Sequence, residues 1–207
     1  MENLNTEEQL MIKSKEEYLY YIKCDREARG FKSKKYFGIR GEIPVYKFQL
    51  LMRKVEYYSN CKKSLFSRIY LIILKYKYKK QQIKYGFSIP INTFGPGLYI
   101  QHRGTICVNG SARIGSNCRI NVDVNIGTNM EKEEEAPIIG DNCFIGPGAK
   151  LFGKIKIGNN VAIGANAVVN KSFGDNVTIA GVPAKVVNAN GTKNRMRYYV
   201  KGKNYEE

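Results

Sequence analysis

Aliphatic residues return at every sixth position through much of the second half of the chain. The series is Ile139, Ile145, Leu151, Ile157, Ile163 and Val169. Neither an α-helix, with a period of 3.6, nor an ordinary strand, with a period of 2, gives this spacing. A parallel β-helix does, because each six-residue stretch makes one flat side and one corner of a coil. The pattern therefore predicts a left-handed parallel β-helix whose aliphatic residues point into a prism.

Glycine directly follows several of these aliphatic residues, as in Ile139-Gly140 and Ile163-Gly164. Glycine and asparagine tolerate a positive φ better than other residues. We therefore expect the positions after the aliphatic residues to adopt that conformation at the corners.

The same spacing extends upstream, and two interruptions mark where the coil must open. The upstream series is Phe94, Ile100, Val108, Ile114, Ile120 and Ile126. Two extra residues between Ile100 and Val108 flank His102. Because His102 lies two positions after the inward-pointing Ile100, we expect it on the outer surface. The longer interval before Ile139 requires residues 127–137 to leave the wall as a loop. Protrusions of a solenoid are where binding sites tend to lie.

The first part of the chain has helical spacing instead. Ser14 and Glu17 have the spacing of a capping box, and Gly30 is expected to end that helix. Its apolar face would use Tyr18, Leu19, Ile22 and also Tyr21. Two longer helices are expected over residues 46–60 and 64–85, with their apolar stripes in the core. The predicted fold class is α+β: a basic helical domain over 1–86, a β-helix over 87–187 and a polar, basic tail over 188–207.

Length and composition narrow the classes of protein. The 207 residues contain no apolar run long enough to span a bilayer and no secretion signal at the start, so we expect a cytoplasmic location. Cys118 and Cys143 occupy small inward positions of the repeat, and the five cysteines show no metal-binding spacing. Neither a disulfide framework nor a metal site is expected.

The net charge of +16 comes mostly from the helical region. Such a charge suits an anionic partner, although lysine-rich helices also simply keep a protein soluble. Tyrosines alternate with lysines over residues 76–80 and could stack on bases, but a half-buried helix face explains them better, and nucleic acid is not favoured. A peripheral contact with an anionic membrane face is a hypothesis from charge alone.

Two motifs resemble a known family. Residues 95–102 (GPGLYIQH) and 180–187 (AGVPAKVV), together with the hexads, resemble the hexapeptide-repeat acyltransferases, in particular serine acetyltransferases and sugar O-acetyltransferases of bacterial surface-polysaccharide clusters. The resemblance covers residues 86–187. It implies a homotrimer with acetyl-CoA as co-substrate, bound between neighbouring prisms.

The resemblance assigns His102 the role of general base. The imidazole would take the proton of an acceptor hydroxyl as that oxygen attacks the thioester, and would then return a proton to the CoA thiolate. The unperturbed pKa of histidine, near neutrality, suits both steps. His102 is the single histidine of the chain.

The acceptor side departs from the serine acetyltransferases. They carry aspartate before the histidine and fifteen residues before it, and these positions here are Gln101 and Phe87. A phenyl ring cannot accept the imidazole proton, so Asn92 and Asp123 are the candidates for orienting His102 or contacting substrate. Loss of the neighbouring carboxylate removes a partner for the serine ammonium, which favours an uncharged hydroxyl such as that of a sugar.

Small residues and two lysines match the family's CoA positions. Gly127, Gly146, Ala149 and Ala165 would let the cofactor approach the backbone, and Lys171 and Lys185 would meet its phosphates. Coil geometry explains the small residues equally well, and solvated surface charge explains the lysines.

The sequence therefore predicts an acetyl-CoA-dependent O-acetyltransferase that acts on a sugar or lipid-linked sugar in surface-polysaccharide or cell-wall precursor synthesis. Two alternatives stay open. One is a serine O-acetyltransferase of cysteine biosynthesis, and the other is a non-catalytic, anion-binding scaffold.

Overall fold

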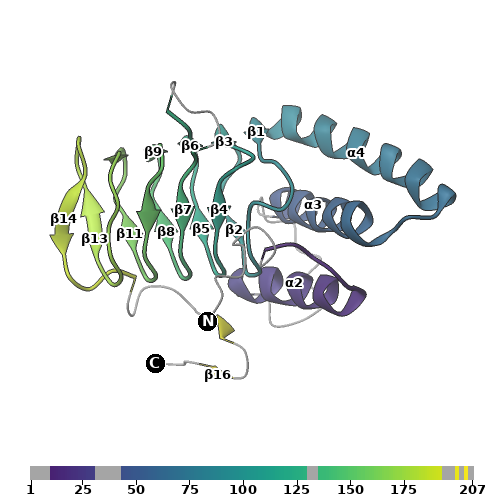
Figure 1. The fold of residues 1–207 in the computed structure, drawn as a ribbon, viewed down its shortest axis with the longest axis horizontal. Helices are drawn as coiled ribbons and strands as arrows, with labels where there is room; N and C mark the ends of the chain where they lie inside the picture. The colour runs from purple at the N-terminus through teal and green to yellow at the C-terminus, as the bar shows by residue number, and fades with distance from the viewer. Residues whose placement is uncertain (1–9, 31–42, 130–134, 193–198, 201–202, 205–207) are drawn as a thin grey trace.

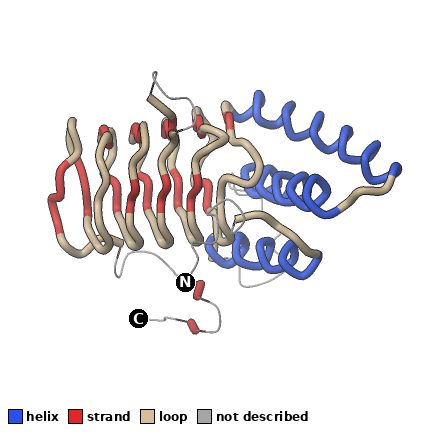
Figure 2. Tube along the Cα trace, viewed as in Figure 1, coloured by secondary structure: helices blue, strands red, loops and turns tan. Residues whose placement is uncertain are grey.

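Three helices stand at one end of the molecule and a prism of short strands at the other (Figure 1). The computed structural model describes residues 10–30, 43–129, 135–192, 199–200 and 203–204. The helices are α2 (Lys15–Ala28), α3 (Ile43–Cys61) and α4 (Leu65–Tyr85). Figure 2 shows how short the strands are, each a brief straight segment between turns.

The helix ends follow the capping signals in the sequence. The Ser14 side chain accepts a hydrogen bond from the Glu17 backbone nitrogen, and Gly30, with a φ of 74°, follows the end of α2. Gly86 ends α4 in the left-handed conformation. The helix α3 begins earlier than predicted, because Pro44 lies in its first turn, where a proline needs no hydrogen-bond partner.

Three sheets form the three faces of the prism. The first face holds β1 (Phe87–Ser88), β3 (Ile106–Val108), β6 (Val124–Gly127), β9 (Lys150–Phe152) and β12 (Val168–Val169). The second holds β4 (Arg113–Ile114), β7 (Ile138–Ile139) and β10 (Lys156–Ile157). The third holds β2 (Tyr99–Ile100), β5 (Arg119–Ile120), β8 (Phe144–Ile145), β11 (Ala162–Ile163), β13 (Thr178–Ala180) and β14 (Lys185–Asn188).

The strand register confirms the parallel β-helix and both interruptions. Ile145 pairs with Ile163, one coil of eighteen residues later. Ile100 pairs with Ile120, twenty residues later, because the corner around His102 carries two extra residues. Ile120 pairs with Ile145, twenty-five residues later, because the loop before β7 adds seven. Insertions therefore leave the wall at corners, and the aliphatic residues stay inside.

The corners differ from the prediction in one respect. The left-handed backbone falls two positions after the glycines, on asparagines such as Asn142 and Asn160, whose φ is 57°. These asparagines form a ladder, in which the Asn142 Nδ2 donates to the Asn160 Oδ1 at 3.0 Å. Gly140 is needed for space instead, because a Cβ there would lie 2.8 Å from the carbonyl carbon of Gly158 in the next coil.

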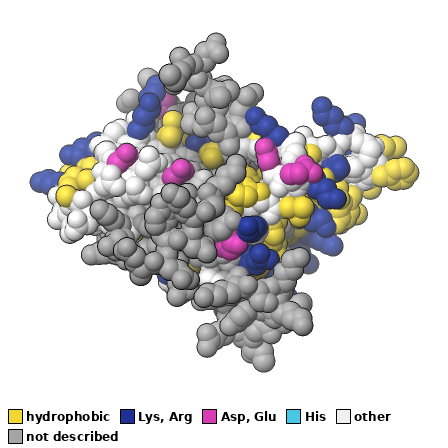
Figure 3. Space-filling view, turned by 90° about the horizontal axis from the view of Figure 1, so that it is seen from below, with side chains coloured by type: hydrophobic (Ala, Val, Ile, Leu, Met, Phe, Trp, Pro, Cys, Tyr) yellow, Lys and Arg dark blue, Asp and Glu magenta, His cyan; other side chains and the backbone are white. Residues whose placement is uncertain are grey.

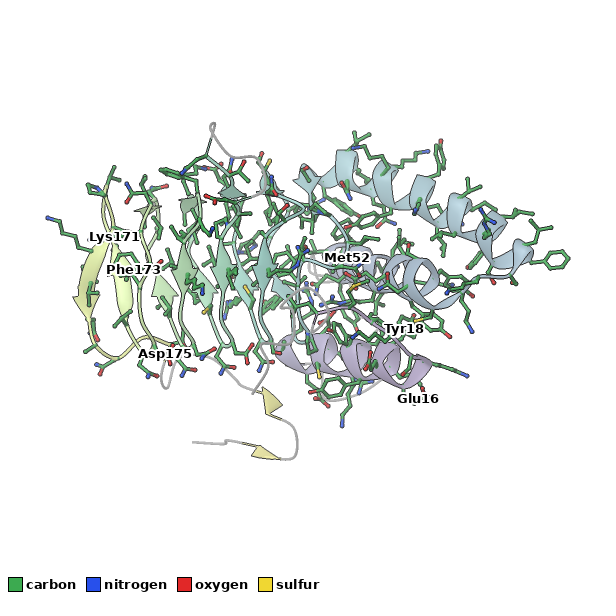
Figure 4. The ribbon with its side chains drawn as sticks, viewed as in Figure 1. Glu16, Tyr18, Met52, Lys171, Phe173 and Asp175 are labelled. Atoms are coloured by element: carbon green, nitrogen blue, oxygen red, sulfur yellow. The ribbon has the colours of Figure 1, made fainter. Side chains whose placement is uncertain are left out.

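One buried cluster joins the helices α3 and α4 to the coils. The Phe48 ring stacks on Tyr78 at 5.2 Å and contacts Phe87 at 4.9 Å between ring centroids. Met52 lies between the helices and the prism (Figure 4). This cluster fixes the first coil against the helices.

Two expectations about helix faces are only partly correct. In α2, Tyr21 is buried and Tyr18 packs against the core as expected, but Leu19 is 55% exposed, and Cys24 and Asp25 are buried instead. In α4 Leu74 and Tyr78 are buried, but most of its aliphatic residues face outward. Helical spacing marks an apolar face without saying whether a neighbour covers it.

The five cysteines form no disulfide bonds. All five thiols are free, and burial raises the pKa of the Cys143 thiol to about 12.

The closing segment packs against the last coils. The strand β14 runs antiparallel to β13, and the Thr192 hydroxyl donates to the Asn142 carbonyl at 2.8 Å. Of the rest of the tail, β15 (Tyr199–Val200) pairs with β16 (Lys203–Asn204). Within the described ranges, every helix is too short or too polar to cross a bilayer.

Candidate functional site

His102 lies on the corner that joins the third face to the first, between β2 and β3, and its side chain is exposed, as predicted. The bulge is held on both sides. The Gln101 nitrogen donates to the Ile120 carbonyl at 3.0 Å, and the Gly104 nitrogen donates to the Tyr85 carbonyl at 3.1 Å. The imidazole thus projects from a fixed backbone.

The helices position the strand that leads to His102. The Gln49 amide donates to the Leu98 carbonyl at 2.6 Å, and the Arg29 guanidinium donates to the Ile100 carbonyl at 2.8 Å. Gln49 Oε1 also accepts from Arg29. Gln49 of α3 and Arg29, the residue after α2, therefore bind backbone carbonyls of β2 and of the residue before it, just ahead of the imidazole.

A buried ion network anchors the preceding turn. Arg53 is fully buried and donates from Nε to Asp25 at 2.9 Å and from Nη1 to Glu56 at 3.0 Å. It also donates to the carbonyls of Phe94 and Gly95, at 2.9 and 2.6 Å. These bonds, with one from Nη2 to Asp25, use all five guanidinium N–H groups.

Asp25 completes this anchor from the other side. One carboxylate oxygen accepts the backbone nitrogens of Gly97 and Leu98, both at 2.9 Å. Sequence reasoning missed the network. The available signal was the occurrence of charged residues among the apolar positions of α3, where Arg53 follows Gln49 by four and precedes Glu56 by three.

A cation and a neutral amide lie on the third face beside the His102 corner. The Arg119 Nε donates to the Gln101 Oε1 at 3.0 Å. The Arg119 guanidinium lies 4.9 Å from the centroid of the Tyr99 ring. Gln101 therefore presents its amide with its oxygen already occupied, and the remaining Arg119 donors are on its terminal nitrogens.

The other acceptor-side candidates lie in different environments. Asp123 is on the same corner as His102, one coil further, and its carboxylate pairs with the Lys150 Nζ at 3.0 Å. Asn92 lies on another corner of the same coil, where Asn60 donates to its side chain at 3.0 Å. The expectation that Asn92 orients His102 within one chain is therefore not supported. Phe87 is buried in the core and offers no hydrogen-bond acceptor.

The residues predicted to contact CoA divide among several places. Gly146 and Ala165 lie on the His102 corner in successive coils, since a Cβ at Gly146 would lie 2.8 Å from the Ala165 nitrogen. Ala149 is fully buried, so its methyl group packs inside the prism and is not an outer contact. Gly127 ends β6 on the first face.

The two candidate phosphate-binding lysines lie toward the far end of the prism. Lys185 begins β14 and is exposed. Lys171 and Phe173 lie at the end away from the helices (Figure 4), with the ammonium 5.5 Å from the ring centroid. Among the described residues, no group of three His, Cys, Asp or Glu side chains could hold a metal ion.

Parts of this chain are similar in sequence to known proteins. Residues 136–171 match the bacterial transferase hexapeptide family (six repeats). A serine acetyltransferase of Staphylococcus aureus (strain N315) is 39% identical over 100 residues, which cover 48% of this chain and 47% of that protein. A serine acetyltransferase of Staphylococcus epidermidis (strain ATCC 12228) matches to the same extent. The match thus spans about half the length of these relatives.

Solved structures share the fold over more of the chain. The serine acetyltransferase of Brucella abortus strain S19 superposes with a TM-score of 0.67 and 24% identity, over 90% of this chain and 74% of that one. The Neisseria gonorrhoeae serine acetyltransferase gives a TM-score of 0.61 and 24% identity, over 82% and 65%. The chain therefore carries the hexapeptide repeat of bacterial transferases, and its β-helix is serine acetyltransferase-like.

Proposed function

We propose that the protein is an acetyl-CoA-dependent O-acetyltransferase in which His102 is the general base. The exposed imidazole on a bulged corner carries this proposal. His102 removes the proton of an acceptor hydroxyl while that oxygen attacks the acetyl carbonyl. The bond from carbon to sulfur then breaks, and the imidazolium returns the proton to the thiolate. The products are an acetyl ester and free CoA.

Small residues lie on the same corner as His102 in later coils, and they support a path for the cofactor along that corner. From β2 to β13 the third face has four strand-to-strand steps, or about 19 Å at the usual strand spacing. An extended pantetheine arm could follow this corner past Gly146 and Ala165, with the phosphates near Lys185. The complex of the Brucella abortus enzyme with coenzyme A, at a TM-score of 0.64, shares the fold on which this path is drawn.

A homotrimer of left-handed β-helices would explain why the other CoA candidates lie elsewhere. Gly127 ends β6 and Lys171 follows β12, both strands of the first face, so neither residue is on the His102 corner. In a closed three-fold assembly, a second prism can bring a different corner to the same cleft. The CoA site would then be built from two copies of the chain.

Gly127 offers a direct test of the cofactor path. Among the described residues, a Cβ at this position would meet only the exposed Asn125 side chain, at 3.2 Å, so packing of the coils does not require the glycine. We expect Gly127→Ala to keep the thermal unfolding temperature and to weaken CoA binding by about 10-fold, equivalent to about 1.4 kcal/mol, in isothermal titration calorimetry.

Gly174→Ala is the matched control, since a Cβ there would meet no atom of the described part of the chain within 4 Å. It should change neither stability nor CoA affinity. Unchanged CoA affinity in the Gly127→Ala protein would remove Gly127 from the cofactor site.

Two acceptors fit this chemistry, and they rest on different observations. The names of the matched relatives favour serine. The residues around His102 favour an uncharged or acidic acceptor, such as a sugar hydroxyl on a larger precursor, because Gln101 is neutral and the Asp123 carboxylate is already paired with Lys150. An ammonium group would need a carboxylate partner there, and Arg119 would repel it.

Release of CoA thiol, measured with a panel of acceptors, tests both. Rapid turnover with serine would establish the serine acetyltransferase function and end the sugar proposal. Turnover with nucleotide-linked or lipid-linked sugars, and not with serine, would establish the sugar O-acetyltransferase. Hydrolysis-level rates with every acceptor, unaffected by substitution of His102, would favour the non-catalytic scaffold.

A further inference from the structure

The outward side of α4 carries a row of large apolar side chains. Their exposed fractions are Leu65 69%, Phe66 84%, Ile69 52%, Ile72 69%, Ile73 45%, Tyr76 68% and Ile83 73%. Monomeric soluble proteins seldom leave such a row uncovered unless it meets something. We call these seven residues the α4 stripe.

The α4 stripe lies opposite the face that packs on the protein. At about 100° per residue, Ile83 is half a turn away from buried Leu74, nine positions earlier. Ile72, Tyr76 and Ile83 follow each other at intervals of four and seven, so they share one side of the helix. The helix thus has two apolar faces, and α3 and the first coil cover only one of them.

Cations border the α4 stripe on both sides. Arg68, Lys75 and Lys79 lie along one border and Lys77 and Lys84 along the other, while Lys80 lies within the stripe between Tyr76 and Ile83, and all six are exposed. The sequence of α4 contains no Asp or Glu. The absence of acidic residues extends from residue 57 to residue 122. Seen from the side of α2, the helical end of the molecule shows hydrophobic, Lys or Arg, and Asp or Glu side chains (Figure 3).

We propose that the α4 stripe rests in the interface of an anionic lipid bilayer, with the helix axis in the membrane plane. An apolar row of this kind enters the boundary between headgroups and acyl chains, while the bordering lysines extend to the lipid phosphates. The cations within α4 prevent it from crossing the bilayer, which agrees with the hydropathy of the described helices.

Charge favours lipid over a second copy of this chain as the occupant. If two α4 stripes packed on each other, at least five cations from each copy would face the same seam, with no acidic residue of α4 to offset them. An anionic surface instead attracts each of these lysines and arginines. The helix α4 lies on the outside of α3, with its N-terminal end far from the prism (Figure 1), and the side chains of the stripe are exposed.

Sedimentation with lipid vesicles tests the proposal on the full-length protein. We expect binding to vesicles of phosphatidylcholine with phosphatidylglycerol, weak binding to phosphatidylcholine alone, and a loss of binding at high salt. The double variant Phe66→Glu/Ile72→Glu should reduce partitioning to the anionic vesicles by at least about 10-fold, because it removes two apolar contacts and adds two negative charges.

The control is Leu19→Glu/Val187→Glu, which makes the same change at two other exposed positions, 55% and 62% exposed. It should bind vesicles within about 3-fold of the parent, since only part of the general charge attraction is lost. Equal partitioning of the parent into anionic and neutral vesicles would overturn the proposal. So would a stripe variant that binds as tightly as the control but changes from a larger to a smaller assembly in light scattering, because the stripe would then be a protein–protein interface. CoA release by both variants, measured without lipid, separates this outcome from a failure of the acetyltransferase proposal.

Discussion

Replacement of His102 by alanine is expected to lower the rate of acetyl transfer by about 10²–10⁴-fold, the usual contribution of a positioned general base. The side chain is exposed and lies outside the core, so the fold should not change. CoA affinity should also stay within about 2-fold of the parent, because a general base acts on the transition state and adds little to ground-state binding. The loss should therefore appear in kcat.

Arg103→Ala is the control for this variant. Arg103 is the exposed neighbour of His102 on the same bulge, and its removal alters local charge without removing a base. Steady-state kinetics with the acceptor found by the thiol-release panel measure both proteins. A His102→Ala protein that keeps more than about a tenth of the parent kcat would show that another group takes the proton.

Replacement of Arg53 by methionine is expected to destabilise the protein by about 3–5 kcal/mol, the cost of removing one partner from a buried ion network. Asp25 and Glu56 would both stay buried without their cation, and the carbonyls of Phe94 and Gly95 would lose a donor. The attraction of Asp25 and Glu56 outweighs burial and raises the pKa of Arg53, so the guanidinium cannot escape by losing its proton.

Urea denaturation followed by circular dichroism measures this cost. Lys47→Met on the same helix is the control, because Lys47 is exposed, and its loss should cost no more than about 0.5 kcal/mol. If Arg53→Met does not fold at all, Asp25→Asn supplies a milder test of the same network. A free energy of unfolding within about 1 kcal/mol of the parent for either variant would mean that the network adds specificity but little stability.

The coils could be predicted because their signal is local. Each coil must fill the same narrow interior, so an aliphatic residue recurs at every side, and extra residues can leave only at corners. This constraint located the bulge at His102 and its exposure without any structure. The glycines were read correctly as corner residues but for the wrong reason, since the left-handed backbone falls two positions later, on residues such as Asn142.

The contacts between helices and coils could not be predicted in this way. The bonds of Arg53 to Asp25 and Gly95 join residues 28 and 42 positions apart, and no periodic pattern specifies such pairs. The contact of Arg119 with Gln101 depends on the twenty-residue register of the first coil. Similarly, amphipathic spacing in α4 did not reveal that Leu74 is covered while Ile72 is not.

The attachment of Gln49 and Arg29 to β2 has a consequence for the solubility of the prism. These two side chains occupy the carbonyls of Leu98 and Ile100 at the start of the solenoid. Without the helices, these two carbonyls would lack hydrogen-bond partners. A strand of another molecule could then pair with this open edge. The helical end thus covers the edge of the first coil, where an open sheet could otherwise pair with another strand.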